Sequence, residues 1–184
     1  MKQTVALFPL PSIVLPGGKL SLRIFEPRYI RMVTEAFRQQ RQFGLCIPEV
    51  DELSRYLGTL IDIVDFSQLE DGLLGIVVQG KQRFITSEVN VEDDGLKVAE
   101  IEWLPDWPDR PGEVDDLLIS SWRSFCSQYQ EYRTLYDGIQ NNNLSWHCQR
   151  WLEVLPIDVT VKKRLLLEKD CNEAYLFLSS MLSQ

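Results

Sequence analysis

The segment around Gly75 and Gly80 comes closest to a motif with defined chemistry. Gly75, Gly80 and Lys81 fit the phosphate-binding pattern G-x-x-x-x-G-K-[S/T], but Gln82 stands where a hydroxyl would ligate magnesium. A phosphate-binding loop follows a strand and opens a helix, whereas the residues between these glycines are strongly β-forming and another β-like run follows. The sequence therefore predicts a strand here and no nucleotide cofactor.

Histidine and cysteine chemistry has few candidates. His147 is the only histidine, and it lies beside Cys148 on a predicted helix. Adjacent helix residues point about 100° apart, so this pair cannot form a catalytic dyad, and we expect His147 on the helix surface or at a cap. Cys46, Cys126 and Cys171 are far from one another and from Cys148, which does not suit a zinc site. We predict no catalytic residue, no metal and no cofactor.

Composition sets further bounds. The 184 residues are 45% hydrophobic and 25% charged, as in ordinary globular proteins. A formal net charge of −8 disfavours an extensive nucleic-acid surface. Neither a signal peptide nor an unbroken apolar run of about 18 residues is present, so we expect no membrane span and a cytoplasmic protein with reduced, buried thiols.

The first part of the chain reads as short strands separated by turns. Around the Pro/Gly segment 9–18 and beyond it, β-like runs occupy residues 5–8, 19–25, 43–48, 58–66, 73–79, 83–91 and 97–103. Asp71-Gly72 and Asp94-Gly95 are turn sequences that join antiparallel strands. The pattern predicts a small barrel over residues 1–104, with one inserted helix starting at Pro27.

The last part of the chain reads as helical, after a proline-rich segment at 104–112. A long apolar stripe runs from Leu118 to Tyr136, and a second helix from Leu144 ends at Pro156. A third helix follows Asp158, and Asp170 is expected to cap a fourth. Residues 113–184 are therefore predicted to form a helical bundle, which makes the chain an α+β protein.

The inserted helix also carries arginines. Arg28, Arg31 and Arg38 fall on one face, with Glu35 between them. A solvated face with an internal ion pair is favoured, and a nucleic-acid patch is the alternative.

One stretch resembles a known family, the substrate-recognition (N-terminal) domain of Lon proteases. The residues that carry the resemblance are Phe8-Pro9-Leu10, Leu15-Pro16-Gly17, and the signature Arg23, Phe25, Glu26, Pro27, Arg28 and Tyr29. Weaker matches follow in the same order through the strands and helices. The resemblance covers nearly the whole chain but not the ATPase or peptidase domains of full Lon proteases, so those activities are not expected.

The resemblance implies a PUA-like barrel of about six strands followed by helices, and binding of unfolded or apolar polypeptide segments. The signature residues are expected to be structural, with Arg23, Glu26 and Arg28 fastening barrel to bundle and Glu26 stabilising the start of the helix.

Three functions remain open. The first is a peptide-binding module, serving as an adaptor for a protease or as a sequestering factor. It would use an apolar groove between barrel and helices or, alternatively, an exposed barrel edge. The second is a PUA-like RNA-binding protein, and the third is a small hydrolase whose site the sequence does not reveal. The oligomeric state is left open. The candidate peptide contacts are the aromatic residues Phe25, Tyr29, Phe66, Trp103, Trp107 and Trp122.

Overall fold

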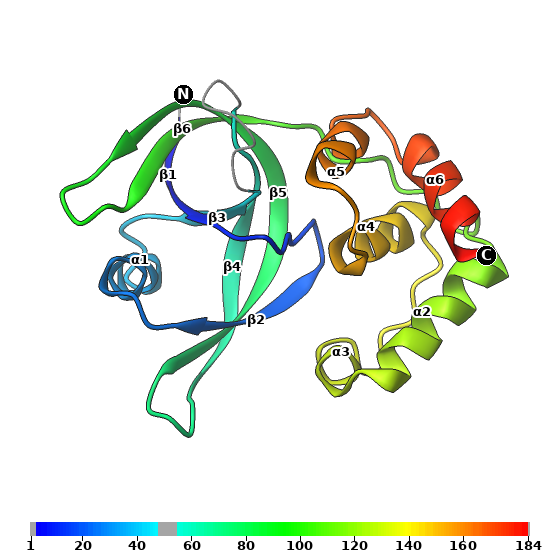
Figure 1. The fold of residues 1–184 in the computed structure, drawn as a ribbon, viewed down its shortest axis with the longest axis horizontal. Coiled ribbons are helices and arrows are strands. Elements are labelled where there is room, and N and C mark those ends of the chain that lie inside the picture. Colours follow the sequence, from blue (N-terminus) through cyan, green and yellow to red (C-terminus); the bar gives the residue numbers. More distant parts are fainter. Residues whose placement is uncertain (1–2, 48–54, 184) are drawn as a thin grey trace. The chain divides into compact units, whose positions relative to one another are not determined.

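The computed structural model describes residues 3–47 and 55–183. The chain divides into two compact units, Met1–Pro105 and Asp106–Gln184, called here the sheet unit and the helical unit (Figure 1). None of the helices formed by the described residues is both long and apolar enough to cross a lipid bilayer.

The sheet unit contains a mixed six-stranded sheet. Its strands are β1 (Gln3–Pro9), β2 (Lys19–Ile24), β3 (Phe43–Cys46), β4 (Leu57–Gln68), β5 (Leu74–Val91) and β6 (Lys97–Trp103). Their hydrogen-bonded order is β2-β5-β4-β3-β1-β6, and β6 pairs with β5 as well. Strands β5, β4, β3, β1 and β6 are thus paired in a closed circuit, and β2 pairs with the first part of β5. Among these six strands, as far as the described residues go, β1 and β3 run parallel and the other pairs are antiparallel.

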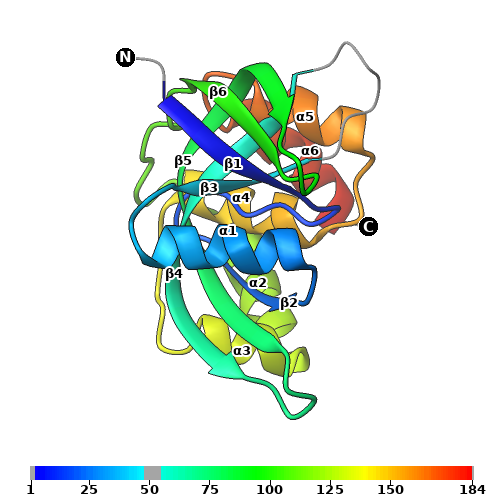
Figure 2. The same ribbon diagram turned by 90° about the vertical axis from the view of Figure 1, so that its left-hand side faces the viewer.

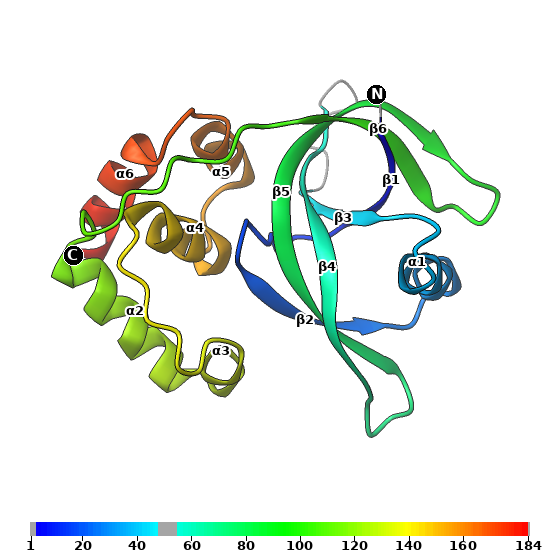
Figure 3. The same cartoon turned by 180° about the vertical axis from the view of Figure 1, so that it is seen from behind.

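Strand β5 is one continuous element, where the sequence predicted two strands separated near Gly80 (Figure 3). Its first part, from Leu74 to Gln79, pairs with β2 and β4, and its last part pairs with β6. Strand β5 stays continuous at Gly80 because a glycine has no side chain, which lets the backbone of Leu15–Gly18 lie against the strand and form hydrogen bonds with it. Gly17 N–H donates to Gly80 O, and Gly80 N–H donates to Gly18 O, each at 2.9 Å. The prediction of two separate strands was therefore wrong, because Gly80 lies within one uninterrupted strand.

Helix α1 (Pro27–Phe37) begins at the proline, as predicted. Met32 and Val33 are buried in a core with Phe43, Ile61 and Ile76, among others. This core cluster therefore lies between α1 and the sheet, while a second cluster around Phe84 includes no residue of α1. Figure 2 shows α1 alongside β4 and the β4–β5 hairpin.

The helical unit contains α2 (Asp116–Gln128), α3 (Gln130–Leu135), α4 (Leu144–Val154), α5 (Val159–Leu166) and α6 (Asn172–Leu182). The predicted stripe from Leu118 to Tyr136 is broken at Tyr129, whose extended backbone ends α2 and begins α3. Helix α4 ends just before Leu155 and Pro156, as predicted.

Side-chain caps mark the starts of α2, α4 and α5. The carboxylate of Asp115 accepts from Leu118 N–H at 2.8 Å, and Asp158 caps α5 in the same manner. Asp170 does not occupy the capping position predicted for it. Cys171 does, while the Asp170 carboxylate accepts from Asn172 N–H at 2.9 Å.

Candidate functional site

An apolar pocket of about 310 Å³ opens on the sheet unit between α1, β4 and β5. Its volume lies at the small end of the range of ligand pockets. The lining is aliphatic and aromatic except for two polar residues at its edge, Thr34 and Arg38. The apolar lining residues are Val33, Phe37, Ile63, Phe66, Leu74 and Ile76.

Two phenylalanines of this pocket are exposed. Phe37 ends α1 and Phe66 lies near the end of β4, and each residue is 61% exposed. Their rings meet edge to face with centroids 5.3 Å apart. Val33 and Ile76, at the base, are buried. The two rings together with the pocket form a contiguous exposed apolar surface on this unit.

The edge of β4 next to this pocket is open. Strand β3 pairs with β4 only over Gly58–Leu60, whereas β5 accompanies β4 to Gln68. Within the described residues, the β3 side of β4 beyond Leu60 therefore has no strand partner. A second hollow of about 1010 Å³ adjoins this edge and shares Phe37 and Ile63 with the pocket. An unpaired edge offers backbone donors and acceptors to an extended chain.

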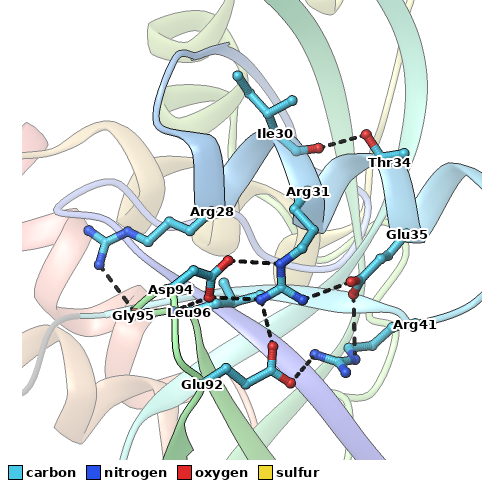
Figure 4. A network of polar contacts seen from close by, with 10 residues as sticks. All are labelled: Arg28, Ile30, Arg31, Thr34, Glu35, Arg41, Glu92, Asp94, Gly95 and Leu96. Atoms are coloured by element: carbon cyan, nitrogen blue, oxygen red, sulfur yellow. Dashed lines mark hydrogen bonds and ion pairs between the residues drawn. The ribbon is translucent and has the colours of Figure 1, made fainter.

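The arginines of α1 are largely neutralised within the sheet unit (Figure 4). Arg31 contacts Glu92 at 2.6 Å, and Glu35 and Asp94 at 2.8 Å. Hydrogen bonds from Arg31 lower the pKa of the Glu92 and Asp94 carboxyls, so both stay ionised. An ion pair within this helix face was predicted, and Arg31 and Glu35 form one. A face so rich in carboxylates is poorly suited to phosphates.

The signature residues make their contacts within the sheet unit. Arg23 pairs with Asp71 in the β4–β5 turn. The Arg28 guanidinium contacts Glu26 at 2.7 Å and donates to Gly95 O at 3.2 Å. These partners tie the β2–α1 passage to two turns of the same unit. The attachment of barrel to bundle through Arg23, Glu26 and Arg28 stays a prediction. Glu26 occupies the N-cap of α1 without a side-chain cap hydrogen bond, because its carboxylate pairs with Arg28.

Of the six predicted contact residues, only Phe66 lines the apolar pocket. Phe25 is 63% exposed and follows β2. Tyr29 stacks on Phe8 at 4.2 Å and packs against the core. Trp103, at the end of β6, is partly exposed. These four residues thus occupy different places in the sheet unit.

The other two predicted contacts are buried. Trp107 donates its indole N–H to Glu168 O at 2.9 Å. Trp122 lies at the centre of an aromatic cluster in the helical unit, with ring centroids 5.5–6.4 Å from each neighbour. Its neighbours are Phe125, Tyr132, Tyr136, Trp146 and Trp151. Both rings serve packing, and we do not retain them as contacts.

His147 is buried, contrary to the expected surface position, and its Nε2 lies 2.9 Å from Asn141 O. Burial lowers its pKa and favours the neutral ring. Cys46, Cys148 and Cys171 are buried free thiols, and Cys126 is a half-buried one. In the part of the chain that the structure describes, no three His, Cys, Asp or Glu side chains are grouped so as to hold a metal ion.

The pocket residues that the sequence did not single out are Phe37 and its aliphatic neighbours. Phe37 belongs to the apolar stripe of α1, and such a stripe normally indicates core. The signal that could have distinguished Phe37 from the buried residues of the stripe is its position as the last residue of the helix, directly before Arg38.

A family model of the ATP-dependent protease La (LON) substrate-binding domain matches residues 4–184. The chain belongs to this family. A solved structure, that of a Lon N-terminal domain protein from Xanthomonas campestris, is 30% identical with a TM-score of 0.70, and the match covers 97% of this chain and 98% of that one. The N-terminal domain of the Mycobacterium avium complex Lon protease shares the fold, with a TM-score of 0.62 at 15% identity over 99% of each chain.

Curated relatives are longer. Lon protease of Parabacteroides distasonis is 29% identical over 95% of this chain but only 23% of its own length. Protein cereblon of Gallus gallus is 28% identical over 56% of this chain and 24% of its own length. The chain thus spans about a quarter of these proteins. What it shares with the Lon proteases is the substrate-binding part, which is distinct from their ATPase and peptidase parts.

Proposed function

We propose that this LON substrate-binding domain is a non-catalytic module that binds apolar, extended segments of unfolded polypeptides. The observation that carries the proposal is the exposed Phe37–Phe66 pair above an apolar pocket, beside the open edge of β4. Pocket and edge lie in one unit, so the site needs no groove between barrel and helices.

The mode of binding follows from this arrangement. A peptide that lies along the β4 edge would form main-chain hydrogen bonds, which require little sequence specificity. Alternate side chains would point toward the sheet face that α1 covers, where the pocket accepts apolar ones. Folded proteins present neither a free backbone nor exposed apolar side chains in series, so they are poor ligands.

We propose further that the domain acts as an adaptor or a sequestering factor in a reducing cytoplasm, as four free thiols suggest. The two roles have opposite effects on the rate at which a client is degraded. An adaptor speeds the degradation of a permanently unfolded client by a protease, whereas a sequestering factor slows it.

The site is tested by fluorescence anisotropy with a labelled, apolar, unstructured peptide. Phe66→Ala should weaken binding by roughly 5- to 30-fold, the effect of losing about 1–2 kcal/mol at an aromatic contact. Phe25→Ala is the matched control, since Phe25 is equally exposed but lies outside the pocket lining. Equal losses in the two variants, or no binding by the unmodified domain, would overturn the proposal.

A further inference from the structure

Arg38 lies beside the apolar pocket, and no counter-ion pairs with it among the described residues. It follows the last residue of α1 and lines the pocket next to Phe37. Arg28, Arg31 and Arg41 each contact carboxylates, but none of the carboxylates in the described residues pairs with Arg38. The positive charge is therefore available to a ligand.

Nearby carboxylates are already engaged. Asp62, on the adjoining part of β4, pairs with Lys81 at 3.0 Å. Glu35 pairs with Arg31 at 2.8 Å and lies 3.7 Å from Arg41. Asp65 accepts a hydrogen bond from Phe66 N–H. An incoming anion would thus meet Arg38 with its charge undiminished by a direct partner.

The pocket and Arg38 together select a ligand that is apolar and carries a negative charge at one end. In an extended peptide, neighbouring side chains point to opposite faces, and residues i and i+2 are about 7 Å apart. An acidic side chain next to the apolar one would therefore point away from Arg38. The α-carboxylate of a terminal residue, in contrast, is bonded to the same Cα as the side chain in the pocket.

Resting on the proposed function, we infer that the pocket binds the free C-terminus of an unfolded polypeptide. The last side chain, large and apolar, occupies the space between Phe37 and Phe66, and the α-carboxylate pairs with the Arg38 guanidinium. The preceding residues lie along the open edge of β4. Recognition of a terminus would direct the domain to polypeptides whose C-terminal residues are not folded away.

The test compares two unstructured peptides of one sequence ending in Leu-Phe, one with a free C-terminal acid and one with a C-terminal amide. At low salt the acid should bind roughly three- to fivefold more tightly, as for an exposed ion pair, and the difference should shrink at high salt. Arg38→Gln should abolish the difference in affinity between the acid and the amide. Arg38→Lys should retain part of it.

A cation at this position also suits the negative end of the α1 dipole, so each variant is first compared with the unmodified domain by thermal unfolding. An amidated peptide with aspartate two residues before its end supplies the alternative carboxylate. If it binds as tightly as the free acid, the C-terminal assignment is wrong.

The two proposals fail differently. Equal binding of acid and amide, with both weakened by Phe66→Ala, would overturn the role of Arg38 and leave the apolar site intact. Binding of neither peptide would overturn the proposed function itself. A preference for the acid that survives in Arg38→Gln would also contradict the inference.

Discussion

Alanine in place of Gly80 is expected to lower the free energy of unfolding of the sheet unit by about 3–5 kcal/mol. A Cβ built on Gly80 would lie 2.1 Å from Leu15 O and 2.7 Å from its carbonyl carbon. These are backbone atoms, and Leu15 itself is fully buried, so a side-chain rotation cannot relieve the clash.

The magnitude follows from what must move. Separation of the two segments breaks the hydrogen bonds that join Gly80 to Gly17 and Gly18, at about 1 kcal/mol each. Displacement of the buried residues Val14 and Leu15 adds about 1–3 kcal/mol, the usual cost of overpacking a core. Such a loss is a large fraction of the stability of a typical domain.

Urea denaturation followed by far-ultraviolet circular dichroism measures this loss. Gly72→Ala is the control, because its Cβ would meet no atom within 4 Å and the positive φ of 81° alone costs about 1 kcal/mol. If Gly80→Ala cost no more than Gly72→Ala, the close approach of Leu15 to β5 would be refuted.

Other predictions concern the helical unit. Trp122→Ala should cost about 3–5 kcal/mol in urea denaturation, because the ring lies buried among five other aromatic rings; a cost below about 1 kcal/mol would contradict this packing. Burial lowers the pKa of His147 in the folded protein. As the pH falls below about 6.5, the unfolded chain therefore binds a proton at this histidine before the folded protein does, and the free energy of unfolding decreases toward acid pH. The stability difference between the unmodified domain and His147→Gln should therefore change between pH 7.5 and 5.5, and a constant difference would rule the mechanism out. Asp115→Ala removes the cap on Leu118 N–H and should cost about 1 kcal/mol by thermal unfolding, whereas an unchanged midpoint would show that the cap contributes nothing.

Local signals predicted most of the elements. Pro27 sets the start of α1, and Asp71-Gly72 and Asp94-Gly95 form turns in which both glycines have positive φ. Gly80 misled because a glycine inside an apolar run suggests a break. Here it permits contact with a segment more than sixty residues earlier in the chain, and no local pattern encodes that contact.

The site was less accessible to sequence reasoning. Periodicity identifies the apolar face of α1 but not where the helix ends relative to the sheet, so it does not show that Phe37 is exposed. The opposite error applies to Trp107 and Trp122, which were proposed as contacts and are buried. Phe66 was the one candidate that lies at the pocket. Exposure depends on long-range packing, which residue type alone does not determine.

Chemical-shift mapping during titration with an apolar, unstructured peptide would locate the peptide-binding surface of the domain residue by residue. We expect the largest backbone amide shifts at the end of α1, along β4 from Ile61 to Gln68, and at Leu74 to Ile76 in β5. Shifts concentrated in the aromatic cluster around Trp122, or near Phe25 and Trp103 without α1 and β4, would contradict this expectation.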